Sequence, residues 1–312
     1  MKHLYFRNGD AMPSIGLGTW QSKPNEVFDA VLHAIEAGYR HLDCAYIYEN
    51  EAEIGLAIRQ AIKDNLVKRE ELFITTKLWN SEHDPLRVEK AIQNSLKDLQ
   101  LDYVDLYLMH WPIAFKPGVK FSKTPSDLLS LHEMPLSSTW EAMIQLKEKG
   151  LTKHVGTSNF NINKMNLLKY ETGVLPELNQ VEMHPFFQQN TLLQYCTDNI
   201  ILSTAYSPLG SRHLIHTPES VTETQIIQEI AAAHQCAPTQ VVLAWGMQRK
   251  TAVIPKSTNR ERIFSNFKAT DIVLSLIEMQ KIATLERNQR MSKGAYAVME
   301  GGCYTQESIW TH

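Results

Sequence analysis

Apolar residues along the chain follow two alternating patterns, one typical of strands and one typical of helices. Short apolar or β-branched runs predict eight strands. They are Ile15–Gly18, His41–Asp43, Leu72–Thr76, Val104–Met109, His154–Gly156, Leu178–Glu182, Ile200–Ala205 and Ala252–Ile254. Apolar residues three or four positions apart predict the intervening helices. These helical patterns occupy Val27–Ile35, Ile54–Ile62, Val88–Leu99, Ile162–Tyr170, Thr191–Cys196, Glu223–Ala233, Pro238–Met247 and Arg260–Phe267.

Two further signals concern where elements begin and turn. The sequence Ser138-x-x-Glu141 is a capping box and predicts that a helix begins there. Asn8-Gly9 lies between two short runs within residues 1–14, and this dipeptide favours the turn of a β-hairpin. The segments 112–136 and 291–312 lack a clear pattern, and loops this long are either functional or disordered.

The regular strand–helix alternation predicts one domain, residues 1–312, folded as a (β/α)₈ TIM barrel. The main alternative is an open doubly wound sheet, which would carry a GxGxxG fingerprint after an early strand. The nearest match begins at Gly16-Leu17-Gly18 and lacks the third glycine. The barrel is therefore the favoured fold.

Composition narrows the class of protein. The chain has 31 Lys and Arg against 34 Asp and Glu, a formal net charge of −3, so no nucleic-acid partner is expected. No stretch of about 20 apolar residues occurs and the first ten residues resemble no signal peptide, so we expect no membrane association. The 4 cysteines have no CxxC spacing and are expected to be free thiols. These features predict a cytoplasmic protein.

The predicted strands end in polar residues or carry them, and in a barrel these positions meet at one rim, where active sites are built. The residues in question are Gly18-Thr19-Trp20, Asp43, Lys77, His110-Trp111, Ser158-Asn159, Asn179-Gln180 within the sixth strand, Tyr206-Ser207 and Lys256-Ser257. Polar residues at strand ends are common because such ends meet water. That explanation accounts poorly for Asp, Lys and His directly after three consecutive apolar strands.

The most informative group is Asp43, Tyr48, Lys77 and His110. A lysine this near a core needs a partner, and Asp43 on the next strand is the natural one. A lysine ammonium ~4 Å from the Tyr48 phenol would favour phenolate by ~4 kcal/mol, which predicts a lowered pKa and a proton donor. His110 could hydrogen-bond the substrate oxygen. Individually, these residues also fit a structural ion pair, a structural histidine and a half-exposed aromatic.

Several other chemistries find no motif in the chain. HExxH is absent and the cysteines lack ligand spacing, so no metal is expected. GxSxG and GxxxxGK[ST] are also absent, which disfavours nucleophilic hydrolysis and P-loop chemistry.

Three extended motifs, in order, resemble the signatures of the aldo-keto reductases, and the resemblance covers nearly the whole chain. The first runs from Gly38 through Asp43 and Tyr48 to Gly55, the second from Lys149 to Phe160, and the third from Ile254 through Lys256-Ser257 to Arg262 and Asn266. This resemblance implies a barrel whose base is closed by the N-terminal hairpin. It also implies hydride transfer from NADPH to an aldehyde, such as an aldose, or a ketone.

The resemblance also implies roles for individual residues. Tyr48 would donate the proton, and Lys77 and Asp43 would adjust the acidity of its hydroxyl. His110 would orient the carbonyl. Ser158, Asn159 and Gln180 would hold the nicotinamide carboxamide, and Tyr206 would stack on its ring. Lys256, Ser257 and Arg262 would clamp the 2′-phosphate. Further expected cofactor contacts are Gly18, Thr19, Trp20, Asp43, Ser207, Leu209, Asn259 and Asn266.

Some positions depart from the resemblance. Cys44 stands where Thr or Ser is common, Ser265 stands where many members have an acidic residue that contacts the adenine, and Asn259 lies beside the expected phosphate clamp. NADH therefore stays open as a second-choice cofactor. The substrate is expected to be a small carbonyl compound in a pocket lined by Trp20, Tyr48, Trp79, His110, Trp111, Phe115 and Cys303.

Two alternative functions and the oligomeric state also stay open. One alternative is reduction of an activated C=C bond, which the presence of His110 disfavours. The other is a regulatory or structural barrel that binds a nicotinamide cofactor and has incidental activity. A monomer is expected, with a dimer as the alternative.

Overall fold

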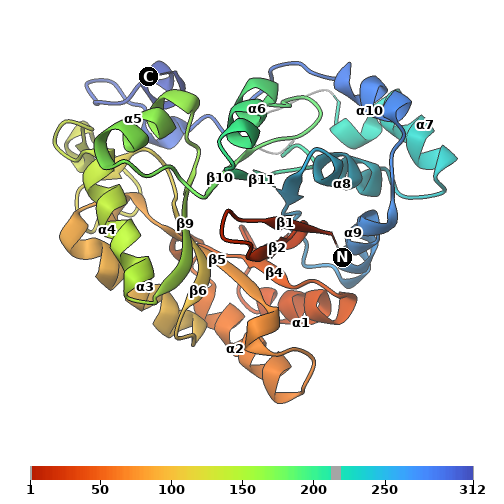
Figure 1. The fold of residues 1–312 in the computed structure, drawn as a ribbon, viewed down its shortest axis with the longest axis horizontal. Coiled ribbons are helices and arrows are strands. Elements are labelled where there is room, and N and C mark those ends of the chain that lie inside the picture. The colour runs from red at the N-terminus through yellow and green to blue at the C-terminus, as the bar shows by residue number, and fades with distance from the viewer. Residues whose placement is uncertain (1, 212–218, 312) are drawn as a thin grey trace.

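The computed structural model describes residues 2–211 and 219–311. Its main sheet has eight parallel strands whose spatial neighbours are also neighbours in chain order (Figure 1). The strands are β3 (Gly16–Gly18), β4 (His41–Asp43), β5 (Phe73–Leu78), β6 (Val104–Met109), β9 (Thr152–Ser158), β10 (Leu178–Glu182), β11 (Leu202–Tyr206) and β12 (Thr251–Val253). Bridges from Ile15 to Val253 and from Gly18 to Lys256 join the first strand to the last. The sheet is therefore a nearly closed barrel, which confirms the predicted fold class.

Helices surround the barrel, and the apolar faces of all but the last share one large core with the outer face of the sheet (Figure 1). The last helix packs in a separate apolar cluster. They are α1 (Val27–Ala37), α2 (Glu51–Lys63), α3 (Pro85–Leu99), α4 (Leu136–Glu148), α5 (Ile162–Thr172), α6 (Asn190–Asp198), α7 (Gln225–Ala233), α8 (Pro238–Gln248), α9 (Arg260–Phe267), α10 (Leu276–Ala283) and α11 (Gln306–Trp310). Among the described residues, no helix is both long enough and apolar enough to cross a membrane.

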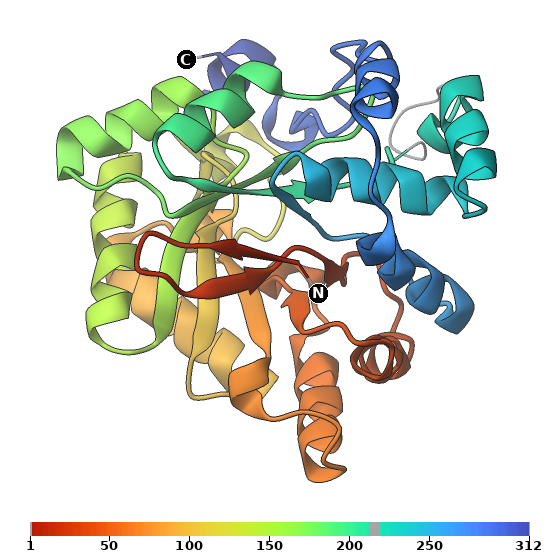
Figure 2. The same ribbon diagram turned by 45° about the vertical axis from the view of Figure 1, so that its right-hand side comes forward.

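The N-terminal hairpin packs across the amino ends of the barrel strands (Figure 2). It consists of β1 (His3–Tyr5) and β2 (Ala11–Pro13), with Gly9 at a positive φ of 90° in the turn. Phe6 and Met12 join a buried cluster with Phe73 and Leu178, which stand at the starts of β5 and β10. The hairpin therefore closes the base of the barrel, leaving the opposite rim for the site.

The structure corrects two of the predicted boundaries. β5 extends to Leu78, so Lys77 lies within the strand rather than after it. α4 begins at Leu136, not at Ser138, because Leu136 is buried and the extended Pro135 precedes the first turn. The capping-box interpretation was therefore wrong.

As far as the structure describes them, the two segments without a clear pattern both contain regular secondary structure. The loop at 112–136 contains a small antiparallel pair, β7 (Ala114–Phe115) and β8 (Leu128–Leu129). The tail carries a 3₁₀ turn at Ala295–Ala297 and then α11. Residues from both segments pack in a second apolar cluster with Trp79 and Trp111. This cluster brings the loop and the tail to the rim that carries the predicted site.

Candidate active site

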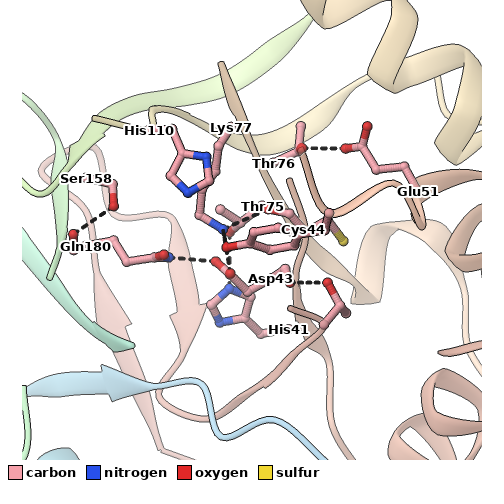
Figure 3. A network of polar contacts seen from close by, with 12 residues as sticks. His41, Asp43, Cys44, Glu51, Thr75, Thr76, Lys77, His110, Ser158 and Gln180 are labelled. Atoms are coloured by element: carbon pink, nitrogen blue, oxygen red, sulfur yellow. Dashed lines mark hydrogen bonds and ion pairs between the residues drawn. The ribbon is translucent and has the colours of Figure 1, made fainter. Parts of the chain in front are cut away.

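A buried ion pair lies at the carboxyl ends of β4 and β5. Lys77 Nζ is 2.6 Å from Asp43 Oδ1, and the two residues are only 1% and 2% exposed. The same amine donates to the Cys44 carbonyl oxygen at 2.8 Å and to the Tyr48 hydroxyl at 3.3 Å. Gln180 reaches Asp43 from across the barrel, and its Nε2 donates to Oδ2 at 2.6 Å (Figure 3). The structure thus brings together the Asp, Lys and Tyr that the sequence singled out.

Burial and the neighbouring charges shift the pKa values of Lys77 and Tyr48 in opposite directions. Burial tends to lower the pKa of Lys77, but Asp43 and Tyr48 together raise it above its ordinary value. The amine therefore stays protonated. Burial raises the pKa of Tyr48 by more than Lys77 lowers it, so the net shift is upward. The expectation of a lowered Tyr48 pKa was wrong because it omitted the loss of hydration.

His110 follows β6 and faces the same group. Its ring meets the Tyr48 ring edge-on at 5.8 Å between centroids and the Trp79 ring at 5.1 Å. Burial, followed by the charge of Lys77, holds the pKa of His110 well below its ordinary value. A neutral imidazole has one N–H, so His110 can donate one hydrogen bond without adding charge to the site.

A second polar network joins the ends of β9, β10 and β11. Asn159 takes the left-handed backbone conformation, with φ 65°, which asparagine tolerates better than most residues. Its Nδ2 donates to the His110 carbonyl oxygen at 3.0 Å, and its Oδ1 accepts from the Tyr206 hydroxyl at 2.7 Å. Ser158 Oγ donates to the Gln180 carbonyl oxygen at 3.0 Å (Figure 3). Five of the predicted site residues are therefore fixed relative to one another.

These groups open onto a cavity of about 550 Å³ at the carboxyl ends of the strands. Most of the residues predicted for the site line it. They are Gly18, Thr19, Trp20, Asp43, Tyr48, Trp79, His110, Trp111, Ser158, Asn159, Gln180, Tyr206, Ser207, Leu209 and Lys256. The wall thus combines aromatic side chains with polar ones.

The other predicted residues lie outside the cavity wall. Lys77 is buried behind Asp43 and Tyr48. Ser257 and Asn259 lie between Lys256 and the start of α9, while Arg262 and Asn266 lie within this helix. Asn259 is the N-cap of this helix, and its side chain accepts from the Arg262 backbone N–H at 2.9 Å. Of the expected phosphate clamp, the structure therefore places Lys256 in the cavity wall, and Ser257 and Arg262 beside it.

Other lining residues were not anticipated, and two expected ones are elsewhere. Ile47, Phe121, Met291, Ser292, Lys293 and Tyr296 belong to the wall. Phe115 is instead buried in the cluster beneath the loop, and Cys303 is exposed. The length of segments 112–136 and 291–312 already indicated that they are either functional or disordered. Their local sequence contains no signal that separates an inward-facing aromatic from one that packs the loop.

The fold and the site define a (β/α)₈ barrel with a polar centre where such barrels carry out catalysis. The profile of the Aldo/keto reductase family matches residues 14–287. An aldo/keto reductase from Synechocystis sp. is 44% identical, with 99% of this chain and 96% of its own length covered. Aldo-keto reductase family 1 member A1 from Gallus gallus is also 44% identical, covering 91% of this chain and 88% of its own.

Similarity extends to three dimensions. The solved structure of the aldose reductase from Schistosoma japonicum superposes with a TM-score of 0.88 at 41% identity, covering 95% of this chain and 96% of that one. The chain belongs to the Aldo/keto reductase family. It is an oxidoreductase of carbonyl compounds, and its substrates are small molecules.

Proposed function

We propose that the protein reduces aldehydes, aldoses among them, and ketones to alcohols with NADPH, and that Tyr48 is the general acid. The observation that carries this proposal is the Tyr48–Lys77–Asp43 arrangement opening onto the cavity. A phenol in contact with a protonated amine has one clear use here, which is to give a proton to a developing alkoxide.

The residues in and beside the cavity suit a nicotinamide dinucleotide. Tyr206 offers an aromatic face, and the amide and hydroxyl groups of Ser158, Asn159 and Gln180 suit a carboxamide. Burial lowers the pKa of Lys256; the nearby Glu26 carboxylate opposes this shift, and the cations Arg262 and Lys23 add to it. Cations held this close together favour an anion such as a 2′-phosphate, which NADH lacks.

Each residue of the polar centre has a separate task in this reaction. NADPH, when bound, supplies the hydride for the carbonyl carbon. Tyr48 donates its proton to the carbonyl oxygen, and Lys77 stabilises the phenolate that remains. Asp43 keeps Lys77 charged and oriented. Neutral His110 donates its N–H to the same oxygen and holds the carbonyl in place.

NADPH oxidation measured with a panel of aldehydes tests the proposed activity. Steady turnover supports it, whereas tight NADPH binding without turnover would instead favour a regulatory barrel. Tyr48→Phe tests the acid: turnover should fall ~10²-fold or more while NADPH still binds. Near-parental activity in this variant would mean that Tyr48 is not the general acid.

A further inference from the structure

The buried carboxylate of Glu182 has no part in the chemistry above, yet it is held by an unusual set of partners. Glu182 is the last residue of β10 and is 0% exposed. Its Oε1 accepts from the backbone N–H of Met291 at 2.8 Å, and its Oε2 accepts from the N–H of Ser292 at 2.7 Å. His184 Nε2 lies 2.8 Å from Oε1 as a third partner. These N–H donors replace the water that the carboxylate loses on burial.

These contacts join the barrel to a segment that has no secondary structure of its own. Residues 292–294 belong to no helix or strand, so their backbone groups lack regular partners. Met291, Ser292 and Lys293 nevertheless line the catalytic cavity. On the far side of this segment, Trp310 Nε1 donates to the Lys293 carbonyl oxygen at 2.9 Å. The wall is thus pinned at two points, and the carboxylate supplies the inner one.

The position of Glu182 on β10 connects this wall with the catalytic group. Gln180, two residues earlier and on the same face of the strand, donates to Asp43. Glu182 itself is paired in register with Tyr206 of β11, which also lines the cavity. β10 therefore carries two side chains that bind different parts of the site: Gln180 hydrogen-bonds to the ion pair, and Glu182 hydrogen-bonds to the tail.

Resting on the proposed reductase function, we propose that Glu182 is a positioning residue that sets substrate specificity by fixing residues 291–293 as a wall of the cavity. Without its two acceptor oxygens, two backbone N–H groups lose their partners and the wall loses its fixed place. Substrates large enough to touch this wall then bind less well. Small substrates that need only the Tyr48–His110 end are unaffected.

The test compares two substrates in two variants at saturating NADPH. Glu182→Gln keeps the shape but turns one acceptor into a donor, and Glu182→Ala removes both acceptors. For a bulky aldehyde such as 2-naphthaldehyde, we expect KM to rise about fivefold in Glu182→Gln and more in Glu182→Ala. For propanal, kcat and KM should stay within about twofold of the parent.

Glu286→Gln is the matched control. Glu286 also clamps backbone near the tail, because it accepts from the N–H of Gln188 at 2.8 Å and of Asn288 at 2.7 Å. It lies outside the catalytic cavity wall. This variant should leave the KM ratio of the two aldehydes unchanged. An equal change in Glu286→Gln, or an equal change for both aldehydes in Glu182→Gln, would mean that Glu182 only stabilises the fold.

Trypsin gives a second readout that needs no substrate. Lys293 is exposed and directly follows the clamped residues, so cleavage after it reports how firmly the wall is held. Cleavage there should be several-fold faster in Glu182→Gln than in the parent or in Glu286→Gln. Unchanged cleavage together with unchanged KM values would overturn the proposal. If the parent itself reduces neither aldehyde, the reductase function fails instead.

Discussion

Replacing Lys77 by methionine tests how the ion pair contributes to catalysis. The change keeps most of the volume but removes the ammonium that lies 3.3 Å from the Tyr48 hydroxyl. At this distance and an effective dielectric of ~20, the ammonium favours phenolate by about 5 kcal/mol. If half of the phenolate charge has developed in the transition state, the loss is about 2.5 kcal/mol, or roughly 10²-fold in kcat.

The same substitution also affects folding, because it leaves the Asp43 carboxylate buried without its cation. Breaking such a pair by removing one partner costs about 3–5 kcal/mol in the free energy of unfolding. The double variant Asp43→Asn/Lys77→Met removes both charges and should recover most of that stability. It should not recover activity, since the ammonium beside Tyr48 is still missing.

Steady-state kcat and urea denaturation of Lys77→Met, Asp43→Asn and the double variant separate the loss of catalysis from the loss of stability. The dependence of kcat on pH adds a third check. Lys77 lowers the pKa of Tyr48, so in Lys77→Met the pH at which activity is lost on the alkaline side should be higher than in the parent. If Lys77→Met keeps half of the parental kcat, the electrostatic argument is wrong. If the double variant regains activity, Lys77 serves only to neutralise Asp43.

Three further predictions follow from single residues. Lys256→Ala and Arg262→Ala should each raise the Kd of NADPH more than that of NADH in a binding titration. An equal rise in both Kd values would mean that these residues do not bind the 2′-phosphate. Burial raises the pKa of Glu51 to about 7, so its folded-state proton stabilises the protein below pH ~4.5 and this benefit disappears as pH rises through ~7. Glu51→Gln should therefore raise Tm more at pH 8 than at pH 5, and an equal change at both would contradict the assignment. Gly18→Ala should lower Tm, because the new Cβ would lie 2.7 Å from the Ile254 carbonyl oxygen where the barrel closes; an unchanged Tm would show that the strands can separate there.

Local sequence determined the strand and helix order and the end of the barrel at which the site lies. A strand is read from a few neighbouring residues, and parallel strands in a barrel bring all their carboxyl ends to one rim. Asp43, Lys77 and His110 could therefore be placed together without coordinates. α10 was missed because its first two residues, Leu276 and Ile277, are 80% and 67% exposed, so its apolar spacing does not mark a buried face.

Tertiary structure alone decided which distant groups meet and how much water they lose. Tyr296 and Met291 reach the cavity because the tail folds back over the rim, a contact that no local periodicity encodes. The direction of the Tyr48 pKa shift depends on burial outweighing the nearby ammonium, and burial is a property of the whole fold. The clamp between Glu182 and Ser292 joins residues 110 positions apart. Hydration and long-range contact are set by the packed chain, so these features emerged only from the structure.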